Sequence, residues 1–293
     1  MPTADATLPA ALPPAVLNRL AGLIRDDRLE LPVLPEVAGQ VVRLTNDDTT
    51  DARKLAELVT RDQALAGNLL RLVNSPLYAP TAPIVSLQQA VARLGLKKIR
   101  EVALIISCES KVFTVPGHEG WVRQQFRHAL AAGAFAQEIA RSRRWNVEEC
   151  FLCGLLHDVG RPVLLQVLVD LHRSCGCPFQ AAAADAAIAK LHTAIGSSLV
   201  KQWALPARLS ETILHHHDPL ASSSAQQTAV MTNLADDLSH YAFGSSLPGA
   251  RAVEEAALRA HPMLPHLNLY PEELDALLAK REAVLAMVRA VVP

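Results

Sequence analysis

The sequence predicts an all-α fold. Half of the 293 residues are hydrophobic but only 4% are aromatic, so the core must be built mainly from leucine, alanine, valine and isoleucine. Leucine and alanine are strong helix formers, and apolar residues recur at helical spacing in segment after segment. No segment shows the alternating pattern of a half-buried strand. A chain of this length can form one large helical domain or two smaller ones.

Short helices are predicted along the first part of the chain, each bounded by proline, glycine or asparagine. Ser86 is placed to cap one of them, and Gly95 separates the last two. Asn74-Ser75-Pro76 ends another, because proline disfavours a helical residue before it and lacks a backbone N–H. The predicted ranges are 16–24, 37–44, 52–60, 63–72, 87–94 and 97–107.

The clearest internal joint is 115–120, which contains one proline and two glycines. Beyond it, Asn146 with Glu149 three residues later resembles a capping box. The helix that this box opens is expected to end at Gly160, with Pro162 just beyond. Pro271 suits the first position of a C-terminal helix. The remaining predicted helices are 121–142, 163–172, 179–190, 192–203, 207–217, 226–241 and 250–259.

Charge and hydropathy exclude several classes of function. The net charge is −1, so no overall field attracts nucleic acid or acidic lipid, and we expect neither as a partner. No apolar run approaches the roughly 20 residues that span a bilayer. The first residues lack the basic segment of a signal peptide. A cytoplasmic location is therefore expected, and there the five cysteines would be reduced thiols.

Two cysteine pairs raise the question of a zinc site. Cys150 and Cys153 lie on an apolar predicted helix, where thiols pack like small hydrophobic side chains. Cys175 and Cys177 lie in a predicted loop, where either could be a reactive thiol instead of a zinc ligand. We expect no zinc at either pair.

Histidines and aspartates that could bind a metal are spread over the second half of the chain. His157 and Asp158 are adjacent at the end of a predicted helix, and can offer one nitrogen and one oxygen to a divalent ion. His128 lies on the preceding helix. A bundle assembles a metal site from side chains of several helices. The later candidates are His192, His216 within the run 215–217, and Asp236 rather than its neighbour Asp237.

These residues stand in the order of a known pattern. Arg127-His128-Ala129-Leu130, His157-Asp158 and Ala235-Asp236 resemble the H…HD…D pattern of the HD superfamily of metal-dependent phosphohydrolases. The first half resembles the N-terminal lobe of the HDOD domain, a relative of that superfamily. The segments that carry this resemblance are Leu34-Pro35, Asp62-Gln63-Ala64-Leu65, Asn74-Ser75-Pro76, Ala90-Val91-Ala92-Arg93-Leu94-Gly95, Leu205-Pro206 and His215-His216-His217-Asp218-Pro219.

The resemblance implies an HD-like helical bundle with an additional N-terminal helical lobe. On that basis we divide the chain into an extension with one helix (1–29), an HDOD domain (30–245) and a C-terminal helical extension (246–293). Within the domain, the N-terminal lobe would cover 30–115 and the HD-like lobe 116–245. The C-terminal helix is expected to dock on the body of the same chain; a homo-oligomer is the alternative.

HDOD domains are generally regarded as bacterial signalling modules, so the resemblance implies a regulatory protein that contacts a signalling partner. Many members have lost part of the metal pattern, whereas this chain keeps His128, His157, Asp158 and Asp236. A divalent metal (Fe, Mn, Zn, Ni or Mg) is therefore a candidate cofactor; the alternative is that His157 and Asp158 form a buried hydrogen-bonded pair that orders the helix end, with no cofactor. The alternative function is a metal-dependent phosphohydrolase that acts on a nucleotide or phosphodiester.

Candidate catalytic residues follow from that alternative. Arg161 stands where HD hydrolases often have a basic residue, and Lys201 could also meet phosphate charge. Cyclic-di-GMP hydrolysis of the HD-GYP type is disfavoured, because no Gly-Tyr-Pro follows the histidine run. The other histidines are expected to be solvated or structural; they are His118, His172, His240, His261 and His266.

Overall fold

The computed structural model describes residues 12–26, 28–32, 36–45, 52–61, 63–74, 83–107, 115–244 and 252–292. The regular elements in these ranges are all helices, which confirms the predicted fold class. They are α1 (Pro14–Arg25), α2 (Glu36–Thr45), α3 (Ala52–Thr60), α4 (Gln63–Val73), α5 (Leu87–Ser107), α6 (Glu119–Arg143), α7 (Val147–Leu156), α8 (Gly160–Cys175), α9 (Ala181–Gln202), α10 (Ala207–His215), η2 (Pro219–Ala221), α11 (Gln226–Phe243), α12 (Glu255–Arg259), η4 (Pro265–Leu267), α13 (Pro271–Leu278) and α14 (Arg281–Val291).

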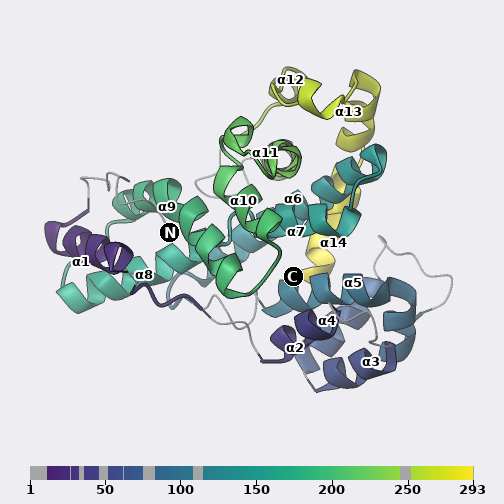
Figure 1. Ribbon diagram of the computed structural model, residues 1–293, viewed down its shortest axis with the longest axis horizontal. Helices are drawn as coiled ribbons and strands as arrows, with labels where there is room; N and C mark the ends of the chain where they lie inside the picture. Colours follow the sequence, from purple (N-terminus) through teal and green to yellow (C-terminus); the bar gives the residue numbers. More distant parts are fainter. Residues whose placement is uncertain are drawn as a thin grey trace.

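Helices α2 to α5 form a small lobe at one end of the molecule (Figure 1). Helix α5 packs against α2, α3 and α4. It is interrupted at Gly95, whose φ of 79° is not helical, as the predicted break between two helices requires. Ser86 Oγ accepts a hydrogen bond from the Gln89 N–H at 3.1 Å, which confirms the predicted cap. Ser75, Pro76 and Cys108 lie outside the described residues.

The larger lobe is a bundle built around α6, which packs against α7 and α11. Residues 128–137 of α6 are all buried, and half of them are alanine. Small side chains let the backbone of α7 approach closely: a Cβ on Gly154 would lie 2.7 Å from the Cα of Gly133. Asn146 Oδ1 accepts from the Glu149 N–H at 3.2 Å and caps α7 as predicted. This close contact sets His157, just after α7, beside α6.

Several predicted helix boundaries are wrong, including that of the helix predicted at 250–259, because α12 begins only at Glu255. The predicted helices 179–190 and 192–203 are one continuous helix, α9, because no proline interrupts this alanine-rich segment. Gly160 opens α8 instead of ending the preceding helix, and Pro162 fits the first turn, where its missing N–H costs nothing. The C-terminal segment forms two helices, α13 and α14, with a turn at Ala279 and Lys280.

The first and the last described helices pack on the larger lobe. Helix α1 lies along α8 (Figure 1), with Val16 and Leu20 fully buried. Helix α14 contacts α6 of the larger lobe and α4 of the small lobe, so it joins the two. Arg127 Nε donates to the Val292 carbonyl at 3.2 Å beside it. The C-terminal helix therefore docks within the same chain, as expected.

One stretch, Val147–Cys175, is long and apolar enough to cross a membrane by length and composition alone. It comprises α7, which packs against α6, and α8, which packs against α9 and α1. Within the fold, 78% of its most apolar 18-residue window is buried, so this stretch supplies core packing.

Candidate metal centre

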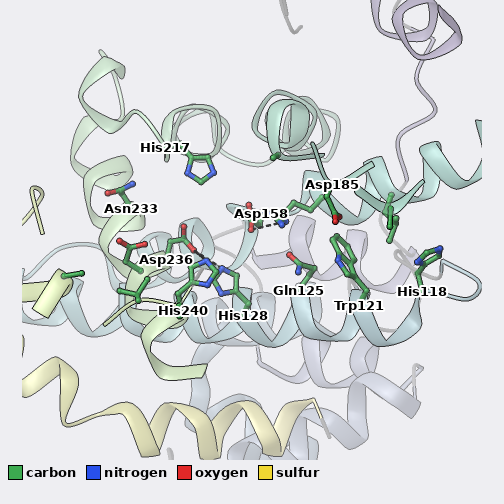
Figure 2. Close-up of a pocket in the computed structure, with 18 of the residues that line it drawn as sticks. His118, Trp121, Gln125, His128, Asp158, Asp185, His217, Asn233, Asp236 and His240 are labelled. Carbon is green, nitrogen blue, oxygen red and sulfur yellow. Dashed lines mark ion pairs between the residues drawn. The ribbon is translucent and has the colours of Figure 1, made fainter. Parts of the chain in front are cut away.

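The six residues predicted as metal ligands come together in the larger lobe. They are supplied by α6, the turn after α7, α9, the turn after α10, and α11. Figure 2 shows part of this cluster, with His128 and Asp236 pointing toward one another across the space between α6 and α11. Each of the six is at least 92% buried; they are His128, His157, Asp158, His192, His216 and Asp236.

Two carboxylates organise the cluster. Asp236 Oδ1 lies 2.9 Å from His128 Nε2 and 3.4 Å from His157 Nε2. Asp158 Oδ1 lies 3.2 Å from His192 Nε2 and 3.7 Å from His216 Nε2. Asp158 also approaches His157, with 3.6 Å between its Oδ2 and the imidazole Nε2. The two aspartates therefore divide the histidines into two adjoining groups.

Backbone carbonyls fix the orientation of three imidazoles. His157 Nδ1–H donates to the Gly154 carbonyl at 2.7 Å, and His216 Nδ1–H to the Ile213 carbonyl at 2.8 Å. His192 Nδ1–H donates to the Ile188 carbonyl at 2.9 Å. A carbonyl oxygen can only accept, so each Nδ1 carries the proton. In the neutral ring each Nε2 then presents a lone pair to the centre of the cluster.

Ser239 fixes the fourth imidazole by a different route. Its single hydroxyl proton is donated to the His128 carbonyl at 2.9 Å. The same oxygen lies 2.9 Å from His128 Nδ1, so it must accept the Nδ1 proton. The Nε2 of neutral His128 therefore also carries a lone pair, which faces the Asp236 carboxylate.

Lone pairs that face carboxylate oxygens in a buried space repel one another unless a cation lies between them. Several buried donor atoms of the six predicted ligands have no hydrogen bond partner: the Nε2 atoms of His128, His157 and His216, and Oδ1 of Asp158 and Asp236. Nitrogen and oxygen donors of this kind suit a divalent transition metal or Mg²⁺. The residues present thus fit a metal.

The donor atoms form two sets, within each of which all atoms lie within 4.8 Å of one another. One set is His128, His157 and Asp236; the other is Asp158, His192, His216 and His217. Each set offers three or four donors, which leaves room for an additional ligand on an ion with five or six positions. Each set could hold one ion.

The charges inside the cluster are strongly perturbed. Burial would lower the pKa of His157, but Asp158 and Asp236 outweigh it and raise that pKa to about 9. Burial would raise the pKa of Asp158, yet His157 and Arg161 hold it well below its ordinary value. Burial, reinforced by His157, keeps the pKa of His216 well below its ordinary value. In metal-free protein at neutral pH, the His157 proton is thus the cation between the carboxylates.

The cluster opens onto a pocket of about 1020 Å³. His128, Asp158 and Asp236 form part of its wall, together with Arg161. The Arg161 Nε lies 3.6 Å from Asp158 Oδ2 and has no hydrogen bond partner. The guanidinium can therefore meet an anion that enters beside the metal ligands.

The other candidate phosphate-binding residue lies elsewhere. Lys201 is half exposed and lies 4.0 Å from Glu211; it is not part of the pocket wall. Nine residues separate it from His192 on the continuous helix α9. At 3.6 residues per turn this places it about 180° around the helix. The expectation that Lys201 faces the site is wrong.

Further histidines belong to the site: His217, which the sequence left as a second candidate within the run 215–217, and His240 and His261, which it expected to be solvated or structural. His217 lies with its Nε2 3.1 Å from that of His192, so two members of the histidine run reach the cluster. His240 Nε2 lies 3.5 Å from Asp236 Oδ1, and the four-residue spacing on one helix could have identified it. His261 Nε2 lies 3.3 Å from Asp237 Oδ2, and both line the pocket. Nothing local in the sequence indicates this last pair.

The described cysteines are all free thiols. Burial raises the pKa of Cys150 to about 12, and burial likewise raises that of Cys153. Both pack inside α7 as small hydrophobic side chains, in line with the sequence expectation. No cysteine belongs to either set of potential ligands among the described residues.

Comparison with known proteins identifies the family. The HDOD domain model matches residues 31–219. The chain belongs to the HDOD family. The match includes five of the six predicted ligands, with Asp236 beyond its end. The boundaries drawn at residues 29, 115 and 245 stay predictions.

Solved structures share the fold of this HDOD protein. A presumed metal-dependent phosphohydrolase from Shewanella amazonensis aligns with a TM-score of 0.71 and 20% identity, over 92% of this chain and 97% of that one. An HDOD domain protein of unknown function from Geobacter sulfurreducens aligns with a TM-score of 0.68 and 25% identity, over 94% and 96%. A presumed signal transduction protein from Marinobacter aquaeolei aligns with a TM-score of 0.66 and 22% identity, over 95% and 66%.

An uncharacterised protein from Treponema pallidum is 25% identical over 211 residues, which are 69% of this HDOD chain and 40% of the relative. The chain thus spans less than half the length of this curated relative.

Proposed function

We propose that this HDOD protein is a cytoplasmic divalent-metal-dependent phosphohydrolase that acts on a nucleotide or phosphodiester. One observation carries the proposal: the oriented, unpartnered imidazole nitrogens and carboxylates border an open pocket. The sequence alone put a non-catalytic signalling role first. A closed cluster whose polar atoms all form hydrogen bonds with one another would support the signalling role. Ligand atoms without hydrogen bond partners beside a large pocket favour hydrolysis instead.

The protein residues would hold and position the reactants. His128, His157 and Asp236 would hold one ion, and Asp158 with His192 and His216 a second. A bound divalent ion supplies Lewis acidity, which polarises a phosphoryl oxygen and lowers the pKa of water. Arg161, at the pocket wall, would bind a non-bridging phosphate oxygen and orient the ester.

Burial of the cluster supports the same chemistry. Burial, with the neighbouring His192, lowers the pKa of His217, so this partly exposed imidazole is neutral near pH 7. The Asn233 side chain donates to the His216 carbonyl at 2.8 Å and holds the turn that carries both histidines. The donors are thus already arranged before a ligand arrives, which lowers the cost of binding.

Elemental analysis of untreated protein tests the proposal first, followed by hydrolysis of a model phosphodiester and of nucleotides by the metal-loaded protein. We expect about one or two ions per chain, and loss of both metal and hydrolysis in His157→Ala. His215→Ala is the matched control, because His215 faces Glu211 at 3.8 Å and lies outside both ligand sets. Metal-loaded protein that hydrolyses no faster than His157→Ala would refute the enzymatic function.

A regulatory role through a protein partner is the second candidate. It is favoured by α14, which contacts both α6 and α4 and so links the metal-bearing lobe to the small lobe. Ligand binding in one lobe could then alter the surface of the other. Hydrogen exchange tests this: metal addition should change amide protection in α2–α4 if the lobes are coupled, and should leave it unchanged if they are not.

A further inference from the structure

The pocket continues well beyond the metal centre along one face of α6. His118, Trp121, Gln125 and His128 all line it, and their spacing of three or four residues places them in one row. Trp121 lies seven residues from the metal-site residue His128, which is about 10 Å along the helix. This arm of the pocket is longer than a phosphate group alone needs.

Helix α9 forms the opposite wall of the arm. Ala181, Asp185 and Ala189 line the pocket at intervals of four residues, so they share one face of the helix. Figure 2 shows Asp185 pointing from α9 toward Trp121 on α6. Because the neighbours of Asp185 on this face are alanines, the space between the two helices is left open as a flat slot. We call Trp121, Gln125, Asp185 and Ala189 the slot residues.

The polar groups of the slot have no partner within the part of the chain that the structure describes. Trp121 offers an indole N–H, Gln125 an amide and Asp185 a carboxylate, and none forms a hydrogen bond or ion pair with another described residue. Phe179 adds a second aromatic ring at the end of the arm, packed edge-on against His118 at 5.1 Å between centroids. The arm thus combines an aromatic face with unused hydrogen-bonding groups.

We propose that the slot residues bind the base of a nucleotide whose phosphate lies at the metal centre. Trp121 stacks on the base, as aromatic side chains do in single-strand nucleic acid binding. The Asp185 carboxylate accepts N–H groups from the base edge, and the Gln125 amide can donate to a ring carbonyl. Guanine presents adjacent N–H donors and a carbonyl, so it matches this set. The inference rests on the proposed function, because it needs phosphate at the metals.

Two other ligands share part of this chemistry but fit the arm less well. An aromatic ring beside a carboxylate also attracts a quaternary ammonium group, as in phosphocholine. The two-carbon link of phosphocholine is too short to reach from the metal centre to Trp121. A sugar phosphate lacks the flat face that Trp121 would cover. A ribose with a planar base spans the distance and uses both features.

Calorimetric binding to metal-loaded protein tests the proposal without turnover as a readout. The probes are GMP, IMP (which lacks the exocyclic amine), ribose 5-phosphate, guanosine and phosphocholine. We expect GMP to bind at least tenfold more tightly than ribose 5-phosphate, and about tenfold more tightly than IMP. Trp121→Leu should remove the advantage over ribose 5-phosphate, and Asp185→Asn the advantage over IMP.

A blocking variant provides a matched control. Ala189→Leu should fill the slot and weaken GMP at least tenfold while ribose 5-phosphate binds unchanged. Ala186→Leu adds the same bulk at an exposed position of the same helix outside the pocket wall, and should leave both affinities unchanged. Thermal melting of each variant shows that it is folded.

The outcomes separate this inference from the proposed function. The base slot is overturned if ribose 5-phosphate or phosphocholine binds as tightly as GMP and Ala189→Leu has no effect. That result does not contradict the metal site. A different result would be that guanosine binds, that Ala189→Leu abolishes this binding, and that ribose 5-phosphate does not bind. It would support the slot but count against phosphate at the metals. If no probe binds, the base slot is overturned, while the proposed function is decided separately by the metal content and hydrolysis of the His157→Ala comparison.

Discussion

The backbone of Gly160 lies against that of His192 with no room for a side chain between them. A Cβ on Gly160 would overlap the His192 carbonyl and lie 2.7 Å from the amide nitrogen of Gly196. This contact joins the start of α8 to the middle of α9. It brings Asp158 and His192 to 3.2 Å, so it positions half of the metal centre.

Gly160→Ala should therefore damage both stability and the site. We expect a loss of about 3 kcal/mol in the free energy of unfolding of metal-free protein, measured with urea, because the two helices must separate. Gly22→Ala is the control: no atom outside its own helix lies within 4 Å of a Cβ there. It should stabilise by about 1 kcal/mol through helix propensity. A Gly160→Ala variant as stable as the parent would contradict the close approach.

Ser239→Ala should weaken metal binding without removing a ligand. Ser239 fixes the Nδ1 proton of His128, and loss of such a supporting hydrogen bond costs about 10- to 100-fold in metal affinity. Competition with a chromophoric chelator measures the affinity. Ser210→Ala is the matched control, since Ser210 is also buried but donates to the Ala207 carbonyl away from the site. Equal affinities in the two variants would show that the Ser239 hydroxyl does not orient His128.

Metal-free protein should lose stability as the pH rises from about 6.5 to 9. The pKa of His157 is raised to about 9 in the fold by Asp158 and Asp236, against the effect of burial. The folded state therefore binds this proton more tightly than the unfolded chain. Its contribution, on the order of 3 kcal/mol, is complete below pH 6.5 and is lost as the pH rises through 9.

Urea unfolding in a chelator across this range checks the sign, and His157→Gln should flatten the curve. Metal-loaded protein should not show the decline, because metal replaces the proton and binds more tightly as the pH rises. Stability in chelator that stays constant or rises to pH 9 would contradict the charged His157.

Arg161→Ala should lower kcat/KM for a phosphoester about 100-fold and leave the metal content unchanged. The guanidinium lines the pocket and can pair with phosphate, and a lost charge-assisted hydrogen bond costs roughly 1.5–3 kcal/mol. Arg173→Ala is the control on the same helix: Arg173 also pairs with an aspartate three residues earlier at 3.6 Å, but it is exposed. Equal losses in the two variants would contradict a specific role of Arg161 in binding phosphate.

Local signals in the sequence predicted the helices where those signals decide the backbone. Gly95 interrupts α5, and Asn146 caps α7, because glycine geometry and side-chain capping act within a few residues. The turn at Ala279 and Lys280 had no such signal, since both residues are good helix formers. There the packing of α13 on α6, and of α14 on α6 and α4, sets the change of direction.

The candidate site shows the same division. By itself the sequence determined the fold class, the family resemblance and six potential ligands, because residue type and order suffice for each. Only the tertiary structure decided that His217, His240 and His261 join them and that Lys201 faces away. Those outcomes depend on how helices distant in the chain approach and rotate against one another. Of these residues, only His240 has a local signal in the sequence, its four-residue spacing from Asp236.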